Sequence, residues 1–158
     1  MSRGSFETRA RQLGLIIPRA PQPVAQYVRC RQHGDMLFVS GQGPVRDGVP
    51  VIVGRVGEDV SVAKAYDAAR LCALNAVAAA KLHLGSLDRL EGVIQVRGFV
   101  NSASDFHDQP VVVDGASDLL VELFGDSGRH ARAALGTSNL PSNIPVEIEV
   151  IFAVEPCR

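Results

Sequence analysis

The stretch HARAALGTSNLPSNIPVEIEVIFAV, residues 130–154, reads as two strands and the loop that joins them. In its second half, apolar side chains alternate with the acidic Glu147 and Glu149, which point the opposite way. The apolar set is Val146, Ile148, Val150, Phe152 and Val154. Residues 130–135 form the other strand, and residues 140–145 form a proline-bounded loop. A strand with one apolar face predicts a sheet that helices cover on one side.

Arg132 lies within the first of these strands, among small apolar residues, where we expect a buried strand. An arginine keeps its charge in proteins, so burying it requires an anion close by. The protein could supply that anion through Glu147 or Glu149, which would make Arg132 part of a structural salt bridge. A ligand could supply it instead. From the residues alone, the two interpretations are about equally well supported.

The region before this stretch predicts two helices. Residues 59–84 begin at Asp59 or Ser61 and end at Gly85, and small side chains follow one another at spacings of three and four. These are Ala65, Ala69, Cys72, Ala76 and Ala80. A second helix starts near residues 108–110 and ends at Gly125. Its apolar face is Ala116, Leu119, Leu120, Leu123 and Phe124.

Further strands are expected at residues 24–31 and 36–41, as a hairpin, and at residues 93–100. Residues 43–58 form a long loop with a short strand at 51–53. The order β-β-α-β-α-β-β predicts a two-layer α+β domain, with two helices on one face of a mixed sheet. The open face is partly apolar, which favours a partner, by default a second copy of the chain.

Composition and charge limit the classes of function that this chain can have. The 158 residues suit one domain, and residues 18–23, PRAPQP, end a short helix expected at 5–13. The net charge of −1 argues against nucleic acid, and no apolar run is long enough to cross a membrane. Three cysteines outside CxxC spacing indicate reduced thiols and a cytoplasmic protein. The four scattered histidines predict no metal site, and the glycines match no phosphate-binding pattern.

Several of these segments together resemble the RidA family, also called the YjgF/YER057c/UK114 family. They are SGQGPV at 40–45, RGFVNSASDFHD at 97–108, and HARAAL, LP and VEIEVI within 130–151. The most specific feature is a Leu-Pro pair eight residues after Arg132, followed by Glu-Ile-Glu. The resemblance covers residues 24–154, which makes residues 1–22 an N-terminal extension of a single domain, 1–158. It implies a chorismate-mutase-like fold and a homotrimer with ligand sites between subunits.

Well-studied members hydrolyse reactive 2-imino and enamine acids to 2-oxo acids and ammonia, without a metal or another cofactor. By this resemblance, Arg132 binds the substrate carboxylate and Glu147 acts on the attacking water. Tyr27 belongs to the pocket, which the backbone of Ser40 and Gly41 helps to frame. From the residues alone, Glu147 would be a solvated strand residue. Tyr27 would fit the core of a strand nearly as well, and Ser40 and Gly41 would fit a strand end.

Two departures point to a divergent, longer subfamily. Ala134 stands where deaminases of the family often have a cysteine. Asp114 is the best match to an asparagine of the family's pocket. A carboxylate at that position would repel an acidic substrate. One alternative is therefore a non-catalytic trimer that binds a 2-oxo acid or similar metabolite. The endoribonuclease and translation-inhibitor labels used in this family are disfavoured by the balanced charge. The leading hypothesis requires an Arg132 guanidinium that no side chain of its own chain neutralises.

Overall fold

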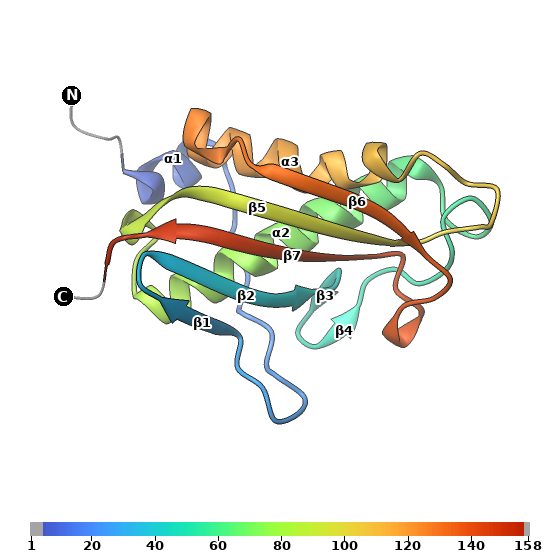
Figure 1. The fold of residues 1–158 in the computed structure, drawn as a ribbon, viewed down its shortest axis with the longest axis horizontal. Coiled ribbons are helices and arrows are strands. Elements are labelled where there is room, and N and C mark those ends of the chain that lie inside the picture. Colours follow the sequence, from blue (N-terminus) through green and yellow to red (C-terminus); the bar gives the residue numbers. More distant parts are fainter. Residues whose placement is uncertain (1–4, 157–158) are drawn as a thin grey trace.

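The computed structural model describes residues 5–156 and contains one five-stranded sheet (Figure 1). Its strand order is β1-β2-β7-β5-β6. The strands are β1 (Cys30–His33), β2 (Met36–Gln42), β5 (Leu90–Asn101), β6 (Ala131–Thr137) and β7 (Val146–Val154). Only the β5–β6 pair among these is parallel, and the other neighbours run antiparallel. The mixed sheet expected from the sequence is confirmed, and β6 is one of its two edge strands.

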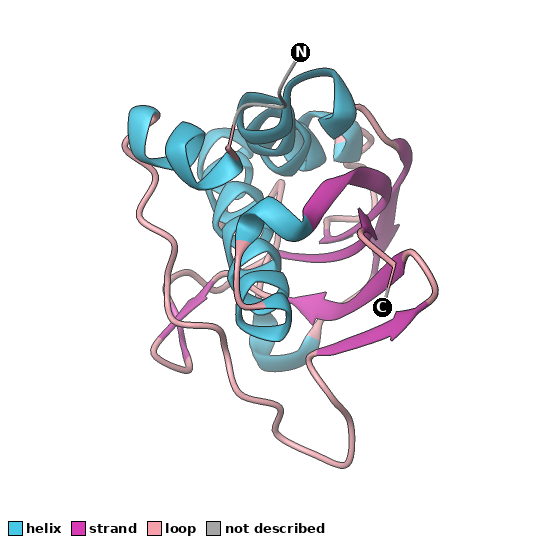
Figure 2. Ribbon diagram, turned by 90° about the vertical axis from the view of Figure 1, so that its left-hand side faces the viewer, coloured by secondary structure: helices cyan, strands magenta, loops and turns pink. Residues whose placement is uncertain are grey.

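Helices α2 (Val62–Leu84) and α3 (Gln109–Phe124) cover one face of this sheet, so that helices and strands form two layers (Figure 2). Helix α2 begins where the Ser61 hydroxyl accepts a hydrogen bond from the Lys64 N–H, and it ends at Gly85 in the left-handed conformation. The short α1 (Phe6–Gln12) joins the helical layer through the ring of Phe6, which meets that of Phe124 edge-on at 4.8 Å. The predicted α+β architecture is therefore confirmed.

The core lies between the two layers and is filled by small side chains on the helical side. All five members of the predicted α2 stripe are fully buried, as are Val146, Ile148, Phe152 and Val154 on β7. Alanine at the contact lets α2 lie close to the sheet, and the longer apolar side chains of β7 fill the space from the other side. This division of volume explains how a chain with few aromatic residues builds a continuous core.

The expected hairpin is confirmed as β1 and β2, but its first strand is shorter than predicted, and a second expected strand is wrong. Residues 24–29 form a loop instead of the start of β1, because the backbone turns at Tyr27 and the Arg29 side chain donates to the Pro21 carbonyl at 2.6 Å. Residues 51–53 are not a strand; the loop instead forms a small hairpin of β3 (Val45–Arg46) and β4 (Val49–Pro50). Three 3₁₀ turns complete the described elements: η1 (Leu87–Arg89), η2 (Gly125–Gly128) and η3 (Pro141–Asn143).

Cys30 and Cys72 are free, buried thiols, while Cys157 lies outside the described residues. Burial raises the pKa of Cys30 to about 11, so this thiol stays protonated and unreactive at neutral pH. Within residues 5–156, none of the helices combines the length and the apolar character that a membrane span requires.

Candidate functional site

The sheet places Arg132 and Glu147 on opposite faces. Arg132 pairs with Val96, whose side chain is buried beneath the helices. Glu147 pairs with Phe99, and its neighbour two residues on, Glu149, forms an ion pair with Arg97 on the open face. Because side chains of paired residues share a face, the Arg132 guanidinium lies on the helical side and the Glu147 carboxylate on the open side. Within one protomer, a salt bridge between Arg132 and either glutamate is therefore excluded.

Arg132 does have a counter-ion, which contradicts the expectation of an unpaired guanidinium. Its Nη1 donates to Oδ1 of Asp114 at 2.7 Å and to the Ser117 hydroxyl at 3.2 Å, both on α3. The expectation of a buried strand is also wrong, because β6 lies at the sheet edge and the Arg132 side chain remains 26% exposed.

His130 extends this network. Its Nδ1 lies 2.7 Å from the Gly128 carbonyl and its Nε2 lies 2.9 Å from the Ser117 hydroxyl. The carbonyl can only accept, so Nδ1 carries the proton and Nε2 accepts from Ser117. Burial, with a contribution from the charge of Arg132, lowers the pKa of His130 and favours this neutral form. The side chain of Ser117 therefore accepts from Arg132 while it donates to His130.

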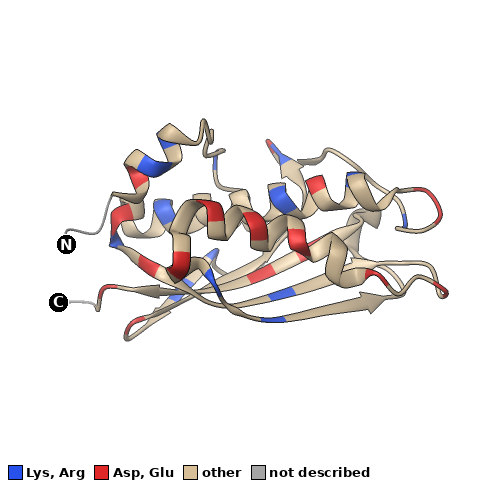
Figure 3. Ribbon diagram, turned by 90° about the horizontal axis from the view of Figure 1, so that it is seen from above, with Lys and Arg blue, Asp and Glu red and all other residues tan. Residues whose placement is uncertain are grey.

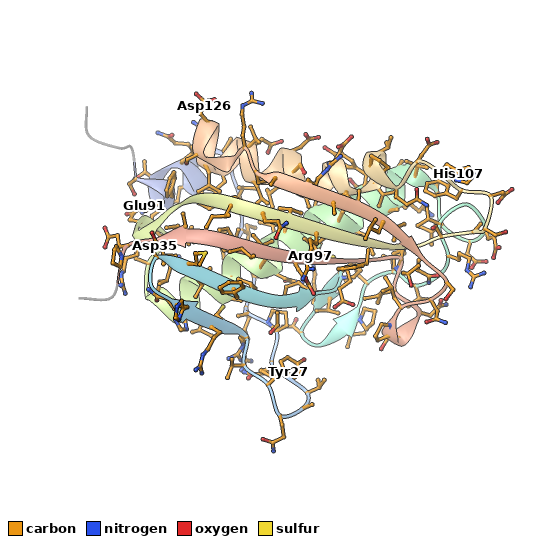
Figure 4. All side chains as sticks on the ribbon, viewed as in Figure 1. Tyr27, Asp35, Glu91, Arg97, His107 and Asp126 are labelled. Atoms are coloured by element: carbon orange, nitrogen blue, oxygen red, sulfur yellow. The ribbon has the colours of Figure 1, made fainter. Side chains whose placement is uncertain are left out.

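The other candidate residues meet at a pocket of about 590 Å³ near the end of β2. Tyr27, Gly41 and Glu147 line it, together with Arg19 from the N-terminal segment and Ser142 from η3. Figure 4 shows Tyr27 on the loop that projects from the sheet beside β1. Its ring is half exposed, so the alternative of a strand core residue is wrong.

Glu147 is the most perturbed group on this pocket wall. It is half-buried, and burial, reinforced by the negative charge of Glu149, raises the pKa of its carboxyl. Within residues 5–156 the Glu147 side chain makes no hydrogen bond or ion pair. Its Oε1 occupies the space where a Cβ of residue 41 would stand, which explains the glycine of the SGQ segment. The interpretation of Glu147 as a solvated strand residue does not fit this environment.

Ser40 has a structural role for its side chain. Its hydroxyl donates to the Val28 carbonyl at 2.6 Å, and its backbone N–H donates to the Arg29 carbonyl at 2.9 Å. These two bonds tie β2 to the loop that carries Tyr27. Ser40 thus supports the pocket wall through the backbone, while its side chain is already engaged.

Sequence reasoning missed two buried asparagines that hold the pocket loops. Asn75 on α2 donates from Nδ2 to the carbonyls of Gly43 and Val45, both at 3.0 Å. Asn101 on β5 donates to the carbonyls of Gly54 and Ile144 and to Oδ1 of Asn143. A polar side chain inside the alanine-rich stretch of α2 was the available signal for Asn75. Arg19 carried no such signal, since its place in the pocket depends on the path of residues 18–29.

One protomer therefore holds two half-sites at different edges of the sheet. The β6 half-site consists of Arg132, Asp114, Ser117 and His130 and can bind charged groups of a small ligand. The pocket half-site consists of Tyr27, Gly41 and Glu147 and offers a carboxylate able to take up a proton.

Comparison with known proteins begins with a family model described as "YjgF/chorismate_mutase-like, putative endoribonuclease", which matches residues 7–153. Protein TCP17 of Trypanosoma cruzi is 38% identical over 149 residues, covering 94% of this chain and 93% of that protein. A 2-iminobutanoate/2-iminopropanoate deaminase of Dermatophagoides farinae is 31% identical over 138 residues, covering 87% and 93%.

Solved structures agree with this assignment. Atu1372 of Agrobacterium tumefaciens, a protein of unknown function, is 43% identical with a TM-score of 0.87, covering 95% of this chain and 92% of its own. TdcF of E. coli, whose structure contains bound serine, is 27% identical with a TM-score of 0.59, covering 87% and 94%. The sequence motifs, the sheet order and these similarities together establish that the chain belongs to the YjgF/chorismate-mutase-like family, the RidA family of the resemblance above.

Proposed function

We propose that this protein is a RidA-like hydrolase that converts reactive 2-imino and enamine acids to 2-oxo acids and ammonia. The observation that carries this proposal is the half-buried Glu147 carboxylate, which faces a pocket and has no partner within residues 5–156. A carboxylate with a raised pKa is a better proton acceptor than an ordinary surface glutamate. The similarity to the mite deaminase and to a serine-binding TdcF supports the same class of substrate.

In the proposed reaction, Glu147 takes a proton from a water molecule as the water oxygen bonds to the imine carbon. The product is a carbinolamine, and the proton then passes from Glu147 to its nitrogen. The C–N bond then breaks and ammonia leaves, while the Glu147 carboxylate takes the proton of the carbinolamine hydroxyl, so that the carbonyl of the 2-oxo acid remains. The imine is intrinsically reactive, so positioning of water and substrate supplies much of the acceleration.

Arg132 anchors the substrate carboxylate in this proposal, although Asp114 is bound to it. Both hydrogen bonds that Arg132 makes to described residues use Nη1. Nε and Nη2 thus have no partner within residues 5–156, and a carboxylate can bind this side of the guanidinium with two parallel hydrogen bonds. The anchor and the base come from different copies of the chain, because one copy holds them on opposite faces of its sheet.

A homotrimer is the proposed assembly that joins the two half-sites. The open sheet face supports it, because Phe38, Ile94 and Leu135 are large apolar side chains that remain exposed in one protomer. A second copy placed against this face would bury them. We also place the protein in the cytoplasm, since its two buried cysteines, Cys30 and Cys72, are free thiols.

A second candidate is a trimer that binds a small amino or 2-oxo acid without converting it. Two observations favour it: Asp114 occupies part of Arg132, and Ala134 offers no functional group on the same side of β6. Such a protein would bind the ligand through Arg132 and leave Glu147 without a catalytic role.

Deamination of freshly generated 2-iminobutanoate separates the two candidates. An amino acid oxidase with catalase can supply the imine from 2-aminobutanoate, and ammonia release reports its hydrolysis. We expect the wild type to accelerate this step, and Arg132→Gln and Glu147→Gln each to lose about a hundredfold or more. Asp67→Asn, an exposed position on α2, is the control and should retain full activity. A wild type that binds 2-aminobutanoate but leaves the imine decay unchanged would establish the binding role instead.

A further inference from the structure

Helix α3 carries three acidic residues one turn apart, Asp114, Asp118 and Glu122, and acidic bands follow this helix in Figure 3. Two of them are used by the fold. Asp118 accepts from the Tyr66 hydroxyl at 2.6 Å, and Glu122 binds Arg70 through both carboxylate oxygens, at 2.7 and 3.2 Å. The bond between Asp114 and Arg132 differs, because it joins one oxygen to one nitrogen.

The single bond leaves both partners with open groups. Arg132 keeps Nε and Nη2, and Asp114 keeps Oδ2, without a hydrogen-bond partner within residues 5–156. Both side chains are accessible, Arg132 to 26% and Asp114 to 46%. A ligand that approaches the sheet edge therefore meets positively charged donors on the Nε/Nη2 edge of the guanidinium and a negatively charged acceptor beyond its Nη1.

The charges of the pair decide which ligand it suits. A plain anion gains from Arg132 but is repelled by Asp114, since the pair carries no net charge. A ligand with a carboxylate and an adjacent positive nitrogen gains from both, and the four charges then alternate around the site. A mismatch against one ligand class is a common source of specificity.

We infer that the Arg132–Asp114 pair selects zwitterionic ligands, small acids with a positively charged nitrogen next to the carboxylate, over 2-oxo acids. This inference rests on the Arg132 site of the proposed function and names its substrate class. A 2-imino acid protonated on nitrogen is such a zwitterion, whereas the 2-oxo acid formed from it is a plain anion. Asp114 thus favours binding of the substrate and departure of the product.

The experiment compares two ligands with one carbon skeleton, 2-aminobutanoate and 2-oxobutanoate, by calorimetric titration of the full chain. The wild type should bind 2-aminobutanoate more tightly. Asp114→Asn keeps the shape and an oxygen that can accept from Nη1 but removes the charge. The affinity for 2-aminobutanoate should fall about fivefold, and the affinity for 2-oxobutanoate should rise about fivefold. This is the size of effect that a partly exposed ion pair produces. Asp118→Asn, one turn away, should change neither affinity.

A wild type that binds 2-oxobutanoate at least as tightly as 2-aminobutanoate, or that binds neither, would overturn the inference. Equal effects of Asp114→Asn and Asp118→Asn would do the same, because they would reflect the general charge of α3. Failure of the proposed function looks different. In that case the imine decays at its uncatalysed rate while the preference for 2-aminobutanoate, and its loss in Asp114→Asn, persist.

Discussion

The two half-sites differ in how their charges are balanced. At the β6 edge, Arg132 has a carboxylate, a hydroxyl and, through that hydroxyl, a neutral imidazole around it. In the pocket, the Glu147 carboxylate forms no ion pair with any of residues 5–156. The charge of Arg132 is thus partly compensated by its own chain, whereas the surroundings of Glu147 disfavour its charge.

The same contrast appears within β7. Glu147 and Glu149 lie two residues apart on one face, yet Glu149 is paired with Arg97 while Glu147 is not. Residue type and strand face are identical, so the two carboxylates differ only in their neighbours. Glu149 thereby serves the sheet, and its charge helps to keep the pKa of Glu147 high.

The largest expected effect tests whether two copies share the site. Arg132→Gln and Glu147→Gln should each be nearly inactive, but co-expression should restore activity. In a trimer that contains both variants, one of the three shared sites keeps both residues, so roughly a third of wild-type activity is expected. Differently tagged chains, purified through both tags, provide the hybrid for the ammonia assay. Hybrids that form and remain inactive would show that the two residues do not meet between copies.

A smaller effect tests the close contact between Gly41 and Glu147. Gly41→Ala places a Cβ on the Glu147 carboxylate, the end of a flexible side chain that can move aside, so we expect the free energy of unfolding to fall by only about 0.5–1.5 kcal/mol. Glu147→Ala removes the atoms in the way, and the double variant should recover most of that loss. Urea denaturation at one fixed chain concentration measures the cycle. If the two single effects simply add, the Glu147 side chain does not pack over Gly41.

The smallest effect concerns the titration of Glu147. Glu149→Gln removes the negative charge that adds to the effect of burial and leaves Arg97 unpaired, and both changes lower the pKa of Glu147. Carbon-13 spectra of the carboxyl groups, assigned with Glu147→Gln, would record the shift. An unchanged or higher pKa in Glu149→Gln would contradict the electrostatic link between the two glutamates.

The same group makes stability depend on pH. The folded pKa of Glu147 lies above its ordinary value of 4.5, so the folded state binds more protons than the unfolded state. Its contribution to stability is therefore fully present below 4.5 and is lost as pH rises through the folded value. In Glu147→Gln, the free energy of unfolding should not show this decrease as pH rises.

The sequence predicted the elements whose signals are local. Alternation along β7, the Ser61 cap and Gly85 fixed one strand and one helix, because each signal acts within a few residues of the chain. The loop at residues 24–29 was not predictable in this way. Its composition suits a strand, and what prevents one is a contact between Arg29 and the Pro21 carbonyl, which depends on the path of the whole N-terminal segment. The extent of the domain, 1–158 with an extension at 1–22, stays a prediction.

The candidate site was predicted as a set of residues but not as an arrangement. The motif spacing identified Arg132 and Glu147, yet only the strand register shows that they lie on opposite faces. The partner of Arg132 was predicted wrongly for the same reason. Asp114 lies next to Arg132, because α3 packs on the helical face of the sheet alongside β6, and Glu147 lies on the open face. Contacts between elements depend on packing, which alternation and motifs do not encode.

The buried amides of Asn75 and Asn101 have a consequence for how the pocket meets its ligand. Each reaches from a rigid element of the core to loops that line the pocket, so these loops cannot move apart without breaking buried hydrogen bonds. Their conformational entropy is lost when the chain folds, before any ligand arrives. Association then requires little further ordering of these loops, so that less binding free energy is lost to conformational entropy.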